Sequence, residues 1–156
     1  MSARTASLSV ATRHRAARSF APALHVVRLA VITALAIDAV VHLTSASSYD
    51  PATGGVITEG NLFRAEAATA GVVALLLLVR PRSWSWAGAL AVSGSALAAV
   101  LLYRYVNVGA IGPIPNLFEP TWQAPGKLVA TYAEAVASVL SGFVLAVTRR
   151  RSRLRQ

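Results

Sequence analysis

The chain contains no cysteine and very few acidic residues. Without cysteine it cannot form disulfides, thiolate metal sites or a dithiol redox centre. Charged residues make up only 13% of its 156 residues, well below the ~25% that is typical of a soluble domain. Hydrophobic residues make up 55%. This composition argues against an ordinary soluble domain and indicates a protein that lies in a membrane.

Four long apolar stretches account for this composition. They cover residues 26–46, 63–79, 85–105 and 127–148, and each is close to the ~20 residues that a helix needs to cross ~30 Å of hydrocarbon. The sequence therefore predicts an all-α fold, a four-helix transmembrane bundle over residues 26–148, in a multi-pass protein of the cell membrane. We expect residues 1–25 to form a disordered basic tail and residues 149–156 a second basic tail, both cytoplasmic.

The charges divide between the two ends of the predicted bundle. The connections around residues 47–62 and 106–126 contain Asp50, Glu59 and Glu119 and no Lys or Arg before the next span. Most basic residues flank the other end: Arg4, Arg13, Arg15, Arg18, Arg28, Arg80, Arg82, Arg149, Arg150, Arg151, Arg153 and Arg155. Because basic residues stay on the cytoplasmic side, both termini should be inside and the two longer loops outside. The net charge of +9 then reflects orientation and contact with anionic lipid headgroups. We expect no nucleic-acid partner, since the tails contain no recognisable folded reader.

Small residues recur at four-residue spacing in each predicted span, a pattern that lets membrane helices pack closely. The four stripes are Ala30, Ala34, Asp38, His42 and Ala46; Glu66, Ala70 and Ala74; Ala87, Ala91, Ser95 and Ala99; and Ala130, Glu134, Ser138, Gly142 and Ala146. Three of the stripes carry ionisable residues. Because a charge that faces lipid is costly, Asp38, His42, Glu66 and Glu134 should converge inside the outer half of the bundle.

This predicted polar cluster has more than one interpretation. Intramembrane ionisable residues are functional candidates by default, whereas the alternative is pairing that only fixes helix register. The four side chains are also ligands of a kind that suits Mn, Fe or Zn. Di-metal sites in helix bundles normally use two Glu-x-x-His motifs, and neither occurs here. The sequence therefore assigns no metal and leaves any cofactor open.

The second outer loop, residues 106–126, contains four prolines and many apolar residues. Prolines stiffen the loop, and Trp122 should lie near the lipid headgroups. We expect the loop to fold onto the bundle as a lid, with Glu119 facing Arg104 or Lys127; the alternative is a simple interfacial anchor. The predicted ligand-binding set is Asp38, His42, Glu66, Arg104, Glu119, Trp122, Lys127 and Glu134.

Two segments of the sequence resemble those of small four-span integral membrane proteins of actinobacteria, which are functionally uncharacterised. The segments are LFRAEA at residues 62–67, and RYVNVG at residues 104–109 followed by GPIPNLFEP-x-W at residues 112–122. The resemblance covers about residues 35–140 and implies a fold and a source, with no activity to carry over. A looser likeness to the DoxX-like group, which is associated with membrane redox partners, rests on span number and size alone.

Three functions follow as hypotheses. The leading one is a non-enzymatic membrane protein whose outward-facing pocket binds a small polar ligand, an ion or a lipid headgroup. The second is a membrane oxidoreductase or quinone-handling partner in which His42 and Asp38 relay protons. The third is a structural accessory subunit whose third-span stripe docks a larger membrane complex or another copy of the chain.

The orientation can be tested with single-cysteine variants, because the natural chain has no cysteine to interfere. Thr53→Cys should react with an impermeant thiol reagent from outside intact cells, and Ser83→Cys should react only after the membrane is opened. The reverse labelling pattern would contradict the predicted orientation.

Overall fold

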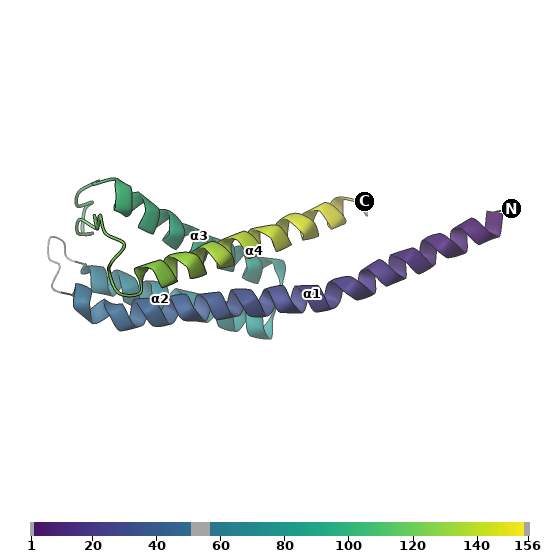
Figure 1. Cartoon of the computed structure of the whole chain (residues 1–156), viewed down its shortest axis with the longest axis horizontal. Coiled ribbons are helices and arrows are strands. Elements are labelled where there is room, and N and C mark those ends of the chain that lie inside the picture. The colour runs from purple at the N-terminus through teal and green to yellow at the C-terminus, as the bar shows by residue number, and fades with distance from the viewer. Residues whose placement is uncertain (1, 51–56, 155–156) are drawn as a thin grey trace.

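The structure, a computed structural model, describes residues 2–50 and 57–154, with side chains for residues 22–50 and 57–154. In chain order its elements are α1 (Ser2–Ser45), the 3-10 helix η1 (Ala46–Tyr49), α2 (Glu59–Val79), α3 (Ser83–Tyr105) and α4 (Lys127–Arg153). The first part of α1 projects beyond the other three helices (Figure 1). The described chain is an all-α four-helix bundle, as the sequence predicts.

Each of the four helices has a segment with the length and composition of a membrane span. The segments are Pro22–Tyr49, Glu59–Val79, Ser83–Tyr105 and Lys127–Arg153. Large apolar side chains lie on their outward faces: Val40, Val72 and Val139 are 61%, 57% and 70% exposed. Soluble proteins rarely expose extended apolar surfaces, whereas in a bilayer such side chains contact lipid. The protein is therefore a multi-pass integral membrane protein, and its orientation stays a prediction.

Two helices begin earlier than the apolar stretches suggest. Helix α2 begins at Glu59 because Thr58 caps it: the Thr58 hydroxyl oxygen accepts a hydrogen bond of 3.1 Å from the Asn61 N–H. Helix α1 begins at Ser2, whereas the sequence predicts a disordered tail over residues 1–25. The side chains before Pro22 lie outside the described residues, so the disorder of this tail stays a prediction. Residues 51–56, which include the labelling position Thr53, also lie outside the described residues.

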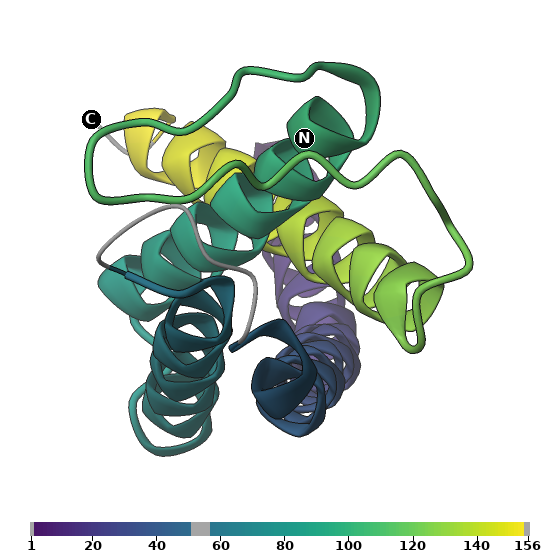
Figure 2. The same cartoon turned by 90° about the vertical axis from the view of Figure 1, so that its left-hand side faces the viewer.

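Small residues bring the helices together. Helix α1 packs mainly against α2 and α4, and α3 packs mainly against α4. Figure 2 shows the helices from the end of the bundle that carries the two longer connections. Ala34 of α1, Ala70 of α2 and Ala130 of α4 are buried, as expected for membrane helices that pack closely through small side chains. The predicted stripes of the first, second and fourth spans therefore lie largely on the packing faces.

The predicted stripe of the third span does not pack against the other helices of the bundle. Ala87, Ala91, Ser95 and Ala99 are all exposed. The buried residues of α3 are Ser85, Trp86, Ala89 and Ser93. Helix α3 has small residues on several faces, so their spacing alone does not select one. The buried face is instead the one that carries the bulky Trp86 and a hydrogen bond to α4, in which the Ser138 hydroxyl donates to Ser93 Oγ at 2.9 Å.

The corner between η1 and α2 is held by a close backbone approach and an ion pair. Gly60 is buried, and a Cβ atom there would overlap the Ala46 carbonyl oxygen and the Asp50 carboxylate. Arg64 donates two hydrogen bonds of 2.7 Å to the two carboxylate oxygens of Asp50. This guanidinium holds the pKa of Asp50 below its ordinary value. The pair therefore resists mild acid and fixes the start of α2 against the end of η1.

Gly60 and Gly71 of the same helix should respond oppositely to alanine. Gly60→Ala should lower the free energy of unfolding by about 1–3 kcal/mol, because the added methyl group overpacks the corner. Nothing lies within 4 Å of a Cβ built at Gly71, so Gly71→Ala should raise it by up to about 1 kcal/mol through helix propensity. Thermal unfolding in detergent, followed by circular dichroism, measures both. A similar shift for both variants would contradict the close approach at Gly60.

Candidate functional site

Asp38 and His42 lie one helical turn apart on one face of α1, as their spacing predicts. His42 Nδ1 is 3.0 Å from the backbone carbonyl oxygen of Asp38 and 3.0 Å from its carboxylate oxygen Oδ1. Hydrogen-bond geometry is met only toward the carbonyl, so the carboxylate contact is close but poorly directed. The Phe63 ring of α2 meets the imidazole edge-on, with the ring centroids 5.0 Å apart. The imidazole is thus positioned from two helices.

Glu134 of α4 completes a group with these two residues. One oxygen or nitrogen from each of Asp38, His42 and Glu134 lies within 4.8 Å of the others. Asp38 is 1% exposed and Glu134 is 2% exposed. We call these three residues the buried group. Their convergence inside the bundle, predicted from their helix faces, is confirmed.

The buried group has more hydrogen-bond acceptors than donors. Among the described residues, both carboxylate oxygens of Asp38 and Oε2 of Glu134 are buried without a hydrogen-bond partner, as is Oε1 of the nearby Glu66. Three carboxylates thus face a single imidazole. An ionised group buried without compensation is costly, and it takes up a proton or a partner instead. The arrangement therefore favours a proton, a metal ion or a donating ligand among these oxygens.

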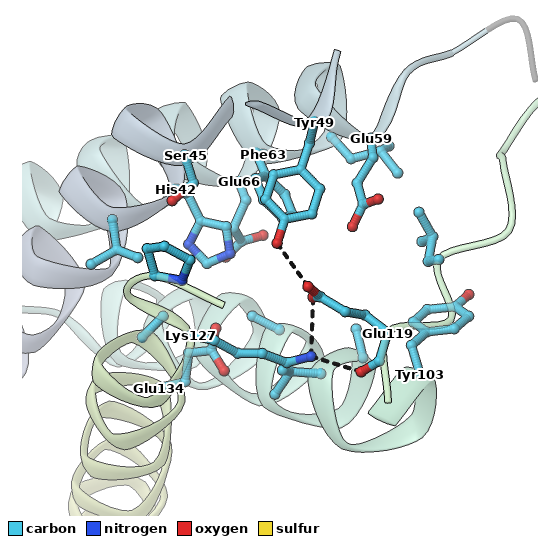
Figure 3. A pocket seen from close by; sticks show the side chains of 18 residues that line it. His42, Ser45, Tyr49, Glu59, Phe63, Glu66, Tyr103, Glu119, Lys127 and Glu134 are labelled. Carbon is cyan, nitrogen blue, oxygen red and sulfur yellow. Dashed lines mark hydrogen bonds and ion pairs between the residues drawn. The ribbon is translucent and has the colours of Figure 1, made fainter. Parts of the chain in front are cut away.

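A cavity of about 240 Å³ leads to this group. It lies at the end of the bundle that carries the two longer connections, and all four helices contribute to its walls. His42, Glu66 and Glu134 line it (Figure 3). Asp38 is not among the lining residues, and its carboxylate lies close to His42 and Glu134. Its apolar walls are formed by Val41, Leu62, Phe63, Ala96, Ala99, Val100, Leu117, Pro125 and Ala130. The cavity therefore combines an apolar wall with a carboxylate-rich base.

Glu119 ties the long loop across the mouth of the cavity. The Tyr49 hydroxyl donates to Glu119 Oε1 at 3.0 Å, and Lys127 Nζ donates to Oε2 at 3.1 Å and to the Glu119 carbonyl oxygen at 2.9 Å (Figure 3). The Glu119 backbone N–H donates to the Tyr103 carbonyl oxygen at 3.1 Å. We call these contacts of Glu119 the latch. They place Glu119 against Lys127, one of the two partners that the sequence predicts.

Two members of the predicted ligand-binding set lie elsewhere. Arg104 and Trp122 are not among the residues that line the cavity. The guanidinium carbon of Arg104 is 5.5 Å from the centroid of the Trp122 ring and 5.1 Å from that of Tyr105, distances typical of cation–π contacts. Lys127 Nζ is also 5.7 Å from the Trp122 ring centroid. Arg104 and Trp122 therefore support the loop from outside the cavity.

Sequence reasoning missed several cavity residues, among them Ser45, Tyr49, Glu59 and Tyr103. A signal for the first two was present. Residues spaced by three and four share a helix face, so Ser45 and Tyr49 continue the face of Asp38 and His42. The predicted first span ends before Tyr49, so Tyr49 falls in a predicted loop. For this reason the sequence does not assign Tyr49 to the helix face that carries Asp38 and His42.

No protein-family model, curated protein or solved structure matches this chain. The resemblance to four-span actinobacterial proteins therefore stays an expectation.

Replacing a glutamate by glutamine should change the stability differently at the mouth and at the base of the cavity. Glu119→Gln removes charge-assisted hydrogen bonds to Lys127, and should lower the free energy of unfolding by about 1–2 kcal/mol. Glu134→Gln removes a buried charge with an unpartnered oxygen, so it should leave the stability of the chelator-treated protein unchanged or raise it. Thermal unfolding of both variants in detergent with EDTA tests this contrast. A clear loss of stability in Glu134→Gln would show that Glu134 is already satisfied by the protein itself.

Proposed function

We propose that this integral membrane protein binds a small, positively charged ligand in its cavity, with Asp38, His42, Glu66 and Glu134 at the base. The observation that carries the proposal is the set of buried carboxylate oxygens without hydrogen-bond partners. A cation offsets their mutual repulsion and the cost of removing them from water. In the predicted orientation the cavity faces the outside of the cell, and the basic tails contact anionic lipid headgroups inside.

The basic side chains nearest this end of the bundle have other partners. Lys127 binds Glu119, Arg64 binds Asp50, and Arg104 lies over Trp122. Within the part of the chain that the structure describes, the base of the cavity therefore has His42 as its one source of positive charge. This balance favours a cation over a phosphate or another anionic headgroup.

The apolar walls and the latch suit retention of a cation. Apolar side chains around the base lower the local dielectric, which strengthens the attraction between a cation and the carboxylates. Glu119 and Lys127 form the mouth, where they hold the loop that contributes Leu117 and Pro125 to the walls. Opening of this loop would admit the ligand.

The same walls favour a second candidate, a quinone-handling or oxidoreductase function. Leu62, Phe63 and Val100 provide a surface for an apolar ring, and His42 lies 3.0 Å from Asp38 Oδ1 for proton transfer. A quinone would co-purify and appear in the ultraviolet spectrum of an organic extract.

An accessory subunit is the third candidate, since the small-residue face of α3 is exposed and suits close approach of another helix. Co-purification of a stable partner would favour it.

Ligand-induced stabilisation tests the leading proposal. Alkylammonium ions, divalent metal chlorides and small carboxylates or phosphates are added separately to the purified protein, and the shift in melting temperature is measured. We expect stabilisation by at least one class of cation and by neither class of anion. Glu134→Gln should weaken the response at least about tenfold, the effect of losing one charged contact.

Asp50→Asn is the matched control. It also removes one carboxylate, but Asp50 lies outside the cavity lining. Its cation response, measured from its own baseline, should equal that of the natural protein. Stabilisation by anions, or an equal cation response in Glu134→Gln, would contradict the proposal.

A further inference from the structure

We infer that the buried group is a binding site for a single divalent transition-metal ion, with Asp38, His42 and Glu134 as its protein ligands. This inference rests on the proposed function and names the class of cation. One donor atom from each residue lies within 4.8 Å of the others. Both oxygens of Asp38 and one of Glu134 are buried without a hydrogen-bond partner, so they are available to a metal ion.

The spacing of the donor atoms fits one ion. Metal–ligand bonds of about 2.0–2.2 Å place two adjacent donors about 2.8–3.6 Å apart in octahedral or tetrahedral geometry. His42 Nδ1 and Asp38 Oδ1 are already 3.0 Å apart. One carboxylate oxygen of Glu134, on α4, lies within 4.8 Å of a donor atom of each of the other two residues. Binding of one ion by all three residues therefore requires the Glu134 side chain to move closer.

The two oxygen atoms that face His42 Nδ1 require either a proton or a metal ion at this nitrogen. This nitrogen is 3.0 Å from two oxygen atoms of Asp38, the carbonyl and Oδ1. A nitrogen lone pair facing two oxygens would be repelled, so either a proton or a metal ion occupies this side of the ring. When a metal ion binds Nδ1, the ring proton moves to Nε2, as in other histidine ligands whose second nitrogen carries the proton.

The donor set indicates which class of metal ion is favoured. One imidazole with two carboxylates suits Mn²⁺, Fe²⁺ or Zn²⁺. Mg²⁺ and Ca²⁺ prefer oxygen ligands alone, and Ca²⁺ takes six to eight of them. Cu⁺ selects thiolate and thioether ligands; the chain has no cysteine, and its one methionine is Met1.

The surroundings of the buried group give an ion access from the cavity and exclude water from the ligands. His42 and Glu134 line the cavity, so an ion can reach both from its mouth. Asp38 closes the far side at 1% exposure. Glu66 lies beside the group with one unpartnered buried oxygen, which places a further carboxylate close to the ion. Burial of this kind excludes competing water and strengthens metal binding.

Metal analysis of the purified protein tests the inference. The protein is prepared without a histidine tag, treated with EDTA, and titrated with Zn²⁺, Mn²⁺ or Co²⁺, with Co²⁺ absorption reporting the ligand set. We expect about one ion per chain, and binding at least about tenfold weaker in His42→Gln and in Glu134→Gln. His25→Gln removes a histidine outside the cavity lining and should bind as the natural protein does.

The outcomes separate this inference from the proposed function. Stabilisation by alkylammonium ions without stoichiometric metal binding would overturn the metal site and leave the cation-binding cavity standing. Metal binding that is equal in the natural protein and both cavity variants would overturn the metal site as well. No response to either class of cation would overturn both. If His42→Gln does not fold, Glu134→Gln and the metal content of the natural protein still decide.

Discussion

The contact between α1 and α4 is the interaction on which the rest of the structure depends. Ala34 of α1 and Ala137 of α4 are buried in one core cluster, and such small side chains let membrane helices approach closely. That approach also forces Asp38 and Glu134 together although their charges repel. Packing elsewhere along the helices must outweigh this repulsion. The fold therefore holds two buried carboxylates close together where α1 packs against α4.

The mouth and the base of the cavity differ in how many of their polar atoms have hydrogen-bond partners. At the mouth, Glu119 receives hydrogen bonds from Tyr49 and Lys127, and its backbone donates to Tyr103. At the base, the oxygens of Asp38 and Glu134 are buried without such partners. Both levels belong to one site built by the same helices. Among Asp38 and the side chains that line the cavity, the buried oxygens without partners thus lie at the base, where a bound cation would sit.

The sequence predicts the span number, the inward direction of Asp38, His42 and Glu134, and a contact of Glu119 with Arg104 or Lys127, of which the structure shows Lys127. These features follow from hydrocarbon length, from the cost of charge in lipid and from opposite charges at neighbouring helix ends. The sequence does not predict which face of α3 is buried, because small residues lie on several faces of this helix and packing against α4 selects one of them. It also fails to separate Arg104 from the cavity, since depth along a helix does not give the direction of a side chain.

The buried residues beyond the cavity limit how an occupant could move. Past the buried group the bundle is closed by Val31, Leu35 and Leu77, each with 0% exposure, and by Trp86 at 4%. Apart from Asp38 and Glu134, none of the fully buried side chains in the described part of the chain is charged. An occupant would enter and leave by the same end, and its residence time would be set by how often the loop around Glu119 releases. A bundle that is closed at one end in this way is poorly suited to conduction across the membrane.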